Sequence, residues 1–190
     1  MKGRLGLLHK LMSSHEPATR MEWVRSALDR FEGPLTRYAE RITGDLHRAR
    51  DIVQDTFIRL CAEDESKVRD RLAEWLFTVC RNRALDVQRK ESRMKPMSDL
   101  QMETCASDEP SPSAASEREE TNSQVVRAIE TLPENQQEVI RLKFQNGLSY
   151  KEISRITSLS VSNVGFLIHT GIKTLRQQLQ PELGLIRENP

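Results

Sequence analysis

The sequence predicts an all-α fold, with two small helical domains joined by a flexible acidic linker. Apolar residues recur at three- and four-residue intervals in both halves of the chain, as on the buried face of an amphipathic helix. No segment shows the alternation of apolar and polar residues that is typical of a β-strand. Residues 96–122 are poor in large apolar side chains and contain three prolines and seven acidic residues. Such a segment cannot bury enough surface to offset the entropy lost on ordering, so it is predicted to be the linker.

Charge is unevenly distributed along the 190 residues, although the net charge is only +1. Residues 1–95 contain 20 Lys and Arg against 15 Asp and Glu, residues 96–122 contain 1 against 7, and residues 123–190 contain 8 against 6. Local charge sets the electric field that a nucleic acid meets. The basic first part of the chain therefore favours a polyanionic partner.

Composition disfavours several classes of protein. No run approaches the roughly 20 apolar residues of a membrane-spanning helix, so no membrane insertion is expected. The apolar patch near the N-terminus is too short for a signal peptide, so residues 1–20 are predicted to be a disordered extension of a cytoplasmic protein. Cys61, Cys80 and Cys105 are widely spaced, which favours buried or incidental thiols over disulfides or a metal site. No cofactor is indicated. The protein is not expected to be an enzyme, because no nucleophile, base and orienting group are clustered.

The first domain is predicted to span residues 21–95. Helices are expected at about residues 22–30 and 34–42, with Gly44 ending the second. A third helix is expected over residues 49–61, with two distinct faces. Its apolar face consists of Ala49, Ile52, Val53, Phe57 and Leu60, and its opposite face of Asp51, Gln54, Asp55 and Ile58.

A polar loop over residues 65–70 is expected to precede the last helix of this domain. That helix is predicted to bury five residues: Leu72, Trp75, Leu76, Val79 and Cys80. Trp75 is interpreted as a core residue rather than a platform for base stacking. Residues 81–95 then contain six Lys and Arg against two acidic residues. A solvated face could carry this surplus, but a polyanionic partner explains it more readily.

The second domain is predicted to span residues 123–180, with residues 181–190 as a tail. The stretch from Thr131 to Glu134 has the form of a capping box, with Pro133 in the first turn of a helix. That helix is expected to run to about residue 145, closed by Asn-Gly at 146–147. A second capping box, from Ser149 to Glu152, is expected to start a short helix that buries Ile153 and Ile156.

Residues 157–160 are expected to form a tight polar turn, with Ser160 as the N-cap of the next helix. That helix is predicted to carry the apolar residues Val161, Val164, Leu167 or Ile168, and Leu175. Two short helices, a tight turn and a longer following helix are typical of a helix-turn-helix. The alternative is an ordinary three-helix packing with polar outer positions.

In a helix-turn-helix the second helix enters the major groove of DNA, with its N-terminal residues facing the base edges. Four residues are therefore expected nearest the DNA: Ser160, Ser162, Asn163 and Phe166. Free amide groups at the helix start also favour a phosphate. Three basic residues are placed to hold the phosphate backbone: Lys151, Lys173 and Arg176.

These segments resemble one known family. Residues 49–60, followed by Trp75-Leu-Phe77 and Arg81-Asn-Arg-Ala84, look like region two of the extracytoplasmic-function (ECF) sigma factors, which belong to the sigma-70 family. Residues 132–134, 147–153 and 161–175 resemble region four. The match covers about residues 22–95 and 123–180, in the order of the family and with a linker where the family has one.

The resemblance implies an alternative RNA polymerase sigma factor, whose partners are core RNA polymerase and promoter DNA. An anti-sigma factor is a further candidate partner, because many relatives are held by one. By similarity, Asp51, Gln54, Asp55 and Ile58 bind the clamp helices of the largest polymerase subunit. The minus-ten element is assigned to the loop over residues 63–69 and to the basic helix. The residues concerned are Glu63, Lys67, Arg69, Arg81, Asn82, Asp86, Arg89 and Lys90.

The region-four helix is then expected to read the minus-thirty-five element, and the acidic linker to thread the RNA-exit path of the polymerase. The sequence departs from the family in this helix. Gly165, Leu167, Thr170 and Ile172 stand where relatives usually carry Arg or Lys. Fewer phosphate contacts imply that this domain binds DNA more weakly and that its affinity depends less steeply on salt. Phe166 offers an apolar contact to a thymine methyl group instead.

A rival interpretation is a regulator that binds an operator without polymerase. It implies tight DNA binding by the isolated protein, usually as a dimer on paired half-sites. The sigma interpretation implies weak binding alone and promoter-specific initiation with core polymerase. No ligand-sensing or receiver domain is recognisable in the sequence, which favours the sigma interpretation.

Overall fold

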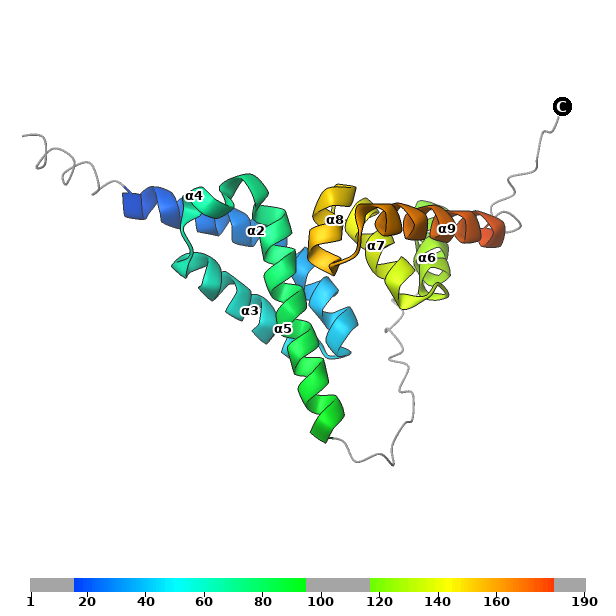
Figure 1. The fold of residues 1–190 in the computed structure, drawn as a ribbon, viewed down its shortest axis with the longest axis horizontal. Helices are drawn as coiled ribbons and strands as arrows, with labels where there is room; N and C mark the ends of the chain where they lie inside the picture. The colour runs from blue at the N-terminus through cyan, green and yellow to red at the C-terminus, as the bar shows by residue number, and fades with distance from the viewer. Residues whose placement is uncertain (1–15, 95–116, 180–190) are drawn as a thin grey trace, which may run out of the picture. The chain divides into compact units, whose positions relative to one another are not determined.

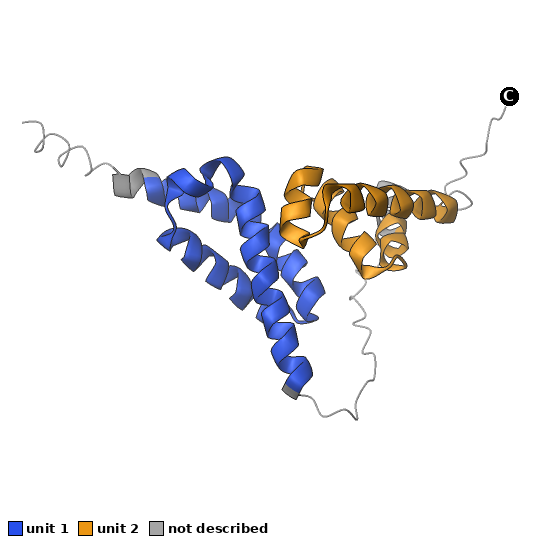
Figure 2. Cartoon of the chain, in the orientation of Figure 1, with its two compact units in different colours: residues 1–101 blue, residues 102–190 orange. Residues whose placement is uncertain are grey.

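A computed structural model describes residues 16–94 and 117–179 of the chain (Figure 1). The chain divides into two compact units, residues 1–101 and 102–190 (Figure 2). All the regular secondary structure of the described residues is helical, which confirms the predicted all-α fold. Residues 95–116, most of the predicted linker, and the predicted C-terminal tail lie outside the described residues.

The first described helix of unit 1, α2, runs from Glu16 to Thr43 without interruption. The prediction of two shorter helices was therefore wrong, and so was the assignment of residues 16–20 to a disordered extension. Pro34 lies inside the helix, where a proline removes one backbone donor and costs about 3 kcal/mol. Apolar burial continues on both sides of it and offsets this cost; the buried residues are Ala27, Phe31, Leu35, Tyr38 and Ala39.

Gly44 ends α2 as predicted. Its φ of +69° is left-handed backbone, which glycine adopts without steric cost. Its N–H donates to the carbonyl of Glu40 at 2.7 Å. The chain then turns directly into the next helix.

Helix α3 runs from Leu46 to Ala62 and begins at an aspartate cap. The side chain of Asp45 accepts a hydrogen bond from the backbone N–H of Arg48 at 3.0 Å, and this bond lowers the pKa of the Asp45 carboxyl. The predicted apolar face is confirmed. Its members are all buried: Ala49, Ile52, Val53, Phe57 and Leu60.

The predicted polar loop after α3 is helical instead. Glu65–Val68 forms the short helix α4, and Arg69–Arg71 forms the 3-10 turn η1. Asp64 caps α4 by accepting from the backbone N–H of Ser66 at 3.0 Å. Val68 is 1% exposed, so one apolar side chain in a polar stretch anchors the segment to the core.

Helix α5 runs from Leu72 to Met94 and contacts both α2 and α3. Leu76 and Cys80 are buried as predicted, whereas Leu72, Trp75 and Val79 are only half-buried. Phe77, absent from the predicted core, is 1% exposed. Its ring meets the edge of the Tyr38 ring at a centroid distance of 5.3 Å. The buried face of α5 is thus rotated from the predicted one towards α2.

Unit 2 consists of four helices among its described residues: α6 (Glu117–Glu130), α7 (Glu134–Phe144), α8 (Tyr150–Thr157) and α9 (Val161–Leu179). Helix α6 begins inside the segment assigned to the linker, so residues 117–122 are helical. Acidic residues are favourable in the first turn of a helix, which explains how an acidic stretch extends it. Ile129, Leu132 and Ile140 form a buried cluster that joins α6 and α7.

The start of α7 differs from the prediction. The N-cap is Pro133, without a side-chain cap, and the hydroxyl of Thr131 donates backwards to the carbonyl of Ala128 at 2.8 Å. Thr131 therefore closes α6 rather than opening α7. The other end of α7 is as predicted: the helix ends at Phe144 with Gln145 as its C-cap, and Gly147, with a φ of +70°, turns the chain after it.

The helix-turn-helix forms from α8 and α9. The capping box is confirmed: the N–H of Glu152 donates to Oγ of Ser149 at 3.3 Å, and the N–H of Ser149 donates to the Glu152 carboxylate at 2.7 Å. Ser160 caps α9, accepting from the N–H of Asn163 at 3.2 Å. Val161, predicted as apolar face, is instead 44% exposed. Leu167 and Ile168 are both buried.

Candidate nucleic-acid interface and docking surface

The outer face of α3 carries the four residues expected to dock on polymerase. Asp51, Gln54 and Ile58 are exposed, and Ile58 is 60% exposed despite its size. Asp55 lies at the edge of this face, where its Oδ2 accepts from Nε of Arg83 at 3.2 Å. The structure thus gathers three of the four on open surface and ties the fourth to α5.

A groove of about 520 Å³ lies beside this face, between α2 and α3. Its lining consists of Val24, Leu28 and Glu32 from α2 and Arg50, Val53, Gln54, Phe57, Ile58 and Cys61 from α3. The sequence did not lead us to expect that α2 lines one side of this groove. The four-residue spacing of Val24 and Leu28 was an available signal, since such residues share one helix face.

Arg20 fixes the end of α3 where the chain leaves towards α4. Its Nη2 donates to the carbonyls of Cys61 at 2.8 Å and Glu63 at 2.5 Å. The backbone N–H of Glu63 in turn donates to the carbonyl of Arg59. Glu63, expected to contact the minus-ten element, therefore has its backbone occupied in capping α3, and its carboxylate accepts from the backbone N–H of Asp64 at 3.4 Å.

The segment after α3 presents cations outwards from a buried anchor. Lys67 and Arg69 flank Val68 in sequence, and both are exposed. Arg69 is paired with the carboxylate of Glu65 one turn earlier. The arrangement presents positive charge to a nucleic-acid strand that passes over α4 and η1.

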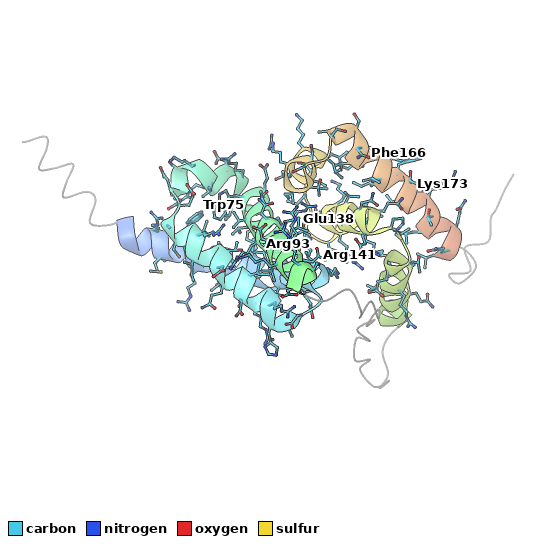
Figure 3. All side chains as sticks on the ribbon, turned by 60° about the horizontal axis from the view of Figure 1, so that its bottom comes forward. Trp75, Arg93, Glu138, Arg141, Phe166 and Lys173 are labelled. Atoms are coloured by element: carbon cyan, nitrogen blue, oxygen red, sulfur yellow. The ribbon has the colours of Figure 1, made fainter. Side chains whose placement is uncertain are left out.

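Helix α5 carries half of the expected minus-ten residues on one exposed stripe. Its members are Asn82, Asp86, Arg89 and Lys90, which recur at four-, three- and one-residue steps and are all exposed. Arg89 and Asp86 form an exposed ion pair at 3.6 Å. Arg81 differs from its neighbours because it is half-buried. Arg93, which sequence reasoning did not assign, extends the stripe near the end of α5 (Figure 3).

In unit 2 the side chains expected at the base edges are exposed at the start of α9. Ser160, Ser162, Asn163 and Phe166 all reach the surface, and Phe166 is 65% exposed. The hydroxyl oxygen of Ser160 is engaged in the cap. The expected phosphate-holding residues are all exposed: Lys151, Lys173 and Arg176. Phe166 and Lys173 both lie along α9 (Figure 3).

A contact between the two helices of the motif was not foreseen. A Cβ at Gly165 would lie 3.7 Å from the ring of Tyr150, so the first turn of α8 rests against α9 at a position without a side chain. The ammonium of Lys143 lies 5.6 Å from the centre of the same ring, within the range of a cation–π contact. Gly165, noted above as a departure from the family, therefore sits at the junction of α8 and α9.

Metal-binding and membrane-spanning features are absent from the part of the chain that the structure describes. In residues 16–94 and 117–179, no group of His, Cys, Asp and Glu is arranged to hold a metal ion. None of the helices described is long and apolar enough to cross a bilayer.

Comparison with known proteins identifies both units. Residues 27–94 match the family model "Sigma-70 region 2", and residues 123–175 match "Sigma-70, region 4". The ECF RNA polymerase sigma factor SigL of Mycobacterium tuberculosis is 30% identical over 172 residues, covering 86% of this chain and 92% of the relative. SigW of Bacillus subtilis is 28% identical over 165 residues, covering 80% and 87%.

A solved structure supports the fold. The sigma factor RpoE of Bartonella quintana, crystallised with the anti-sigma factor NepR, superposes with a TM-score of 0.59 at 22% identity. The alignment covers 82% of this chain and 96% of that protein. With both regions matched in order and a relative aligned over nearly its whole length, the chain belongs to the ECF family of RNA polymerase sigma factors.

Proposed function

We propose that the two helical units of this sigma factor bind different partners. The chain is an alternative RNA polymerase sigma factor that acts in transcription initiation. In our proposal, unit 1 binds core polymerase and the minus-ten element, and unit 2 binds the minus-thirty-five element. The observation that carries this assignment is the ordered match of the two units to sigma-70 regions 2 and 4, each with an exposed face at the residues that the resemblance assigns.

The α2–α3 surface supports docking of a helical partner. Ile58 is an exposed apolar anchor beside a groove, and Asp51 and Gln54 supply a polar, acidic edge. Interfaces commonly combine a central apolar anchor with a charged rim that selects the partner. The partner implied by the resemblance is the pair of clamp helices on the largest polymerase subunit.

The test is a double charge change on this face. Asp51→Arg with Gln54→Arg should abolish co-purification with core polymerase while the circular dichroism spectrum stays unchanged, since both side chains are exposed. Glu22→Arg is a matched control, because Glu22 is exposed on α2 and does not line the groove. Undiminished co-purification of the double variant would remove these residues from the polymerase interface.

The exposed stripe of α5 supports binding to the melting minus-ten DNA. Its cations attract phosphates, while Asn82 can bond to a base edge. The cations of α4 and η1 lie on the segment that the resemblance assigns to capture of a flipped base. Unstacking a base costs a few kcal/mol, so a pocket for it selects sequence while it opens the duplex.

Helix α9 supports duplex recognition upstream. Asn163 and Phe166 are exposed at its start, and Lys173 and Arg176 follow further along the helix. Asn163→Ala should reduce use of the upstream element by about 1–3 kcal/mol if the amide reads a base. Promoter preference that does not change in this variant would assign Asn163 a structural role.

Promoter-specific transcription with purified core distinguishes the sigma function from that of an independent regulator. Runoff transcription from a pool of random promoters should yield a defined promoter only when the chain and core are combined. Tight operator binding by the isolated chain, without any effect on initiation by core, would favour the independent regulator instead. We place the protein in the cytoplasm, where bacterial promoter DNA and polymerase meet.

An anti-sigma factor is a further proposed partner. The similar Bartonella protein was crystallised with one, and family membership makes this chain a candidate for the same kind of control. Affinity capture with the full chain, followed by a test of whether the captured protein blocks runoff transcription, checks this proposal. A captured protein without effect on transcription would not be an anti-sigma factor.

A further inference from the structure

The first two turns of α9 carry no charged side chain. From Val161 to Ile168 the sequence contains no Lys, Arg, Asp or Glu. Val164, Leu167 and Ile168 are buried. The side chains left exposed in these turns belong to Val161, Ser162, Asn163 and Phe166. The part of the helix that meets base edges in a helix-turn-helix is therefore neutral.

This neutral set restricts which base pairs can be recognised directly. Guanine presents two acceptors in the major groove, which Arg or Lys contacts, and cytosine presents a donor, which Asp or Glu accepts. None of these four residue types is available in the first two turns of α9, and the hydroxyl of Ser162, which is exposed there, bonds to any base without discriminating between them. Asn forms a bidentate pair with adenine, and an apolar side chain packs on the methyl group of thymine.

Asn163 and Phe166 are placed to act on neighbouring positions of the groove. They are three residues apart and so lie on adjacent parts of one helix surface, about 4.5 Å apart along the axis at 1.5 Å per residue. Phe166 is 65% exposed, which leaves a large apolar surface for a partner to cover. Ser160, the N-cap, has its hydroxyl oxygen engaged by the backbone N–H of Asn163, so the side-chain amide of Asn163 is free of the cap.

The positive charge of α9 lies further along the helix. Lys173 is seven residues beyond Phe166 and, like Phe166, is exposed (Figure 3). Ser162, Phe166, His169 and Lys173 recur at steps of four, three and four residues, which aligns them along one outer side. The neutral turns are thus available for base edges and the later turns for phosphates.

We propose that the start of α9 selects A·T base pairs in the upstream promoter element, with Asn163 on an adenine and Phe166 on the methyl group of a thymine. The proposal rests on the proposed function, since it names the bases that unit 2 recognises there. In this proposal, Lys173 and Arg176 attract the phosphate backbone and confer no sequence preference.

The experiment uses holoenzyme assembled from the full chain and core polymerase, on a promoter recovered from a random pool. Each thymine of the upstream element is replaced singly by deoxyuridine, which removes only the 5-methyl group. Each adenine is replaced singly by 7-deazaadenine, which removes the N7 acceptor. One deoxyuridine position should reduce initiation about fourfold, the effect of losing one buried methyl group. One 7-deazaadenine position should reduce it about fivefold or more.

Variants assign each effect to a side chain. In Phe166→Ala the deoxyuridine effect should vanish while the 7-deazaadenine effect persists, and Asn163→Ala should give the reverse pattern. Both side chains are exposed, so both variants are expected to fold, which circular dichroism checks. Lys173→Ala is the comparison variant: it should weaken initiation on all templates and reduce the salt slope by about 1, with both base-analogue effects retained.

The outcomes separate this inference from the function on which it rests. If the chain and core recover no promoter, the sigma function itself fails in this assay. If a promoter is recovered but its upstream element depends on G·C pairs at every selected position, base selection by Asn163 and Phe166 is overturned while the sigma function stands. Analogue effects that persist unchanged in Phe166→Ala and Asn163→Ala overturn it equally.

Discussion

Arg83 of α5 donates a hydrogen bond from Nε to Oδ2 of Asp55 on α3, across 3.2 Å. The contact joins the helix proposed to dock on polymerase to the helix proposed to face minus-ten DNA. A second ion pair between the same helices links Arg48 and Glu91. Two polar links thus supplement the apolar core in fixing the register of α3 against α5.

The Asp55–Arg83 pair is expected to contribute little to stability. The two side chains are 47% and 35% exposed, so water screens their attraction. A double-mutant cycle of Asp55→Asn and Arg83→Gln should give a coupling free energy of about 0.2–1 kcal/mol in urea unfolding. The coupling should decrease as salt is raised. A much larger coupling, or one that salt leaves unchanged, would contradict this description of the pair.

The two glycines of α9, Gly165 and Gly171, should have opposite effects on stability when each is replaced by alanine. A Cβ at Gly171 would lie 2.5 Å from Cδ1 of Ile140, which is buried, so Gly171→Ala should destabilise the protein by about 1–3 kcal/mol through overpacking. At Gly165 the nearest atom is an ordinary 3.7 Å away. Gly165→Ala should therefore stabilise by up to about 1 kcal/mol through helix propensity.

Thermal or urea unfolding of both glycine variants measures the difference. Ile140→Val removes the methyl group that a Cβ at residue 171 would meet, so it should restore part of the stability of Gly171→Ala. If Gly171→Ala is as stable as the wild type, the close approach of α7 and α9 at this point is not present in solution.

The capping box of α8 should contribute measurably to the stability of the helix-turn-helix. Ser149→Ala removes the acceptor for the N–H of Glu152 and should lower the free energy of unfolding by about 1 kcal/mol. Ser162→Ala is the matched control, because Ser162 is exposed within α9 and does not cap it. Equal stabilities of the two variants in urea unfolding would argue against the cap.

Cys80 should be inert while the protein is folded. Burial raises the pKa of its thiol to about 12, because the thiolate would lose its hydration. In a Cys105→Ser background at pH 8, iodoacetamide should modify the exposed Cys61 and leave Cys80 unmodified until urea is added. Mass spectrometry of peptides distinguishes the sites. Rapid native alkylation of Cys80 would show that α5 opens readily.

The raised pKa of Cys80 also gives the sign of a pH effect. The thiol ionises near its ordinary pKa of 9.0 in the unfolded chain but near a pKa of about 12 in the folded one. Its contribution to stability is therefore complete below pH 9 and is lost as the pH rises towards 12. Measured between pH 8 and 11, the stability advantage of the wild type over Cys80→Ala should decrease. An advantage that increased with pH would reverse the sign of the assigned shift.

Local sequence signals determined much of the fold and the family. The spacing from Ala49 to Leu60 specifies a helix face, Gly44 and Gly147 supply the positive φ values that end helices, and Ser149 with Glu152 closes a capping box. Each signal depends on residues that are close together along the chain, so the sequence contains the whole interaction. The polymerase-docking and minus-ten residues followed from the resemblance of ordered motifs, and the residues of unit 2 that face DNA followed from the helix-turn-helix pattern. Most of them are exposed.

Tertiary structure alone decided the features that depend on residues distant in sequence. Burial along α2 carries the helix through Pro34, and the core anchors Val68 in a segment that looks like a loop. The groove between α2 and α3, the Asp55–Arg83 pair and the contact of Tyr150 with Gly165 each join separate helices. Helical spacing fixes which residues share a face, but only packing determines which face a neighbouring helix covers and which remains open to a partner.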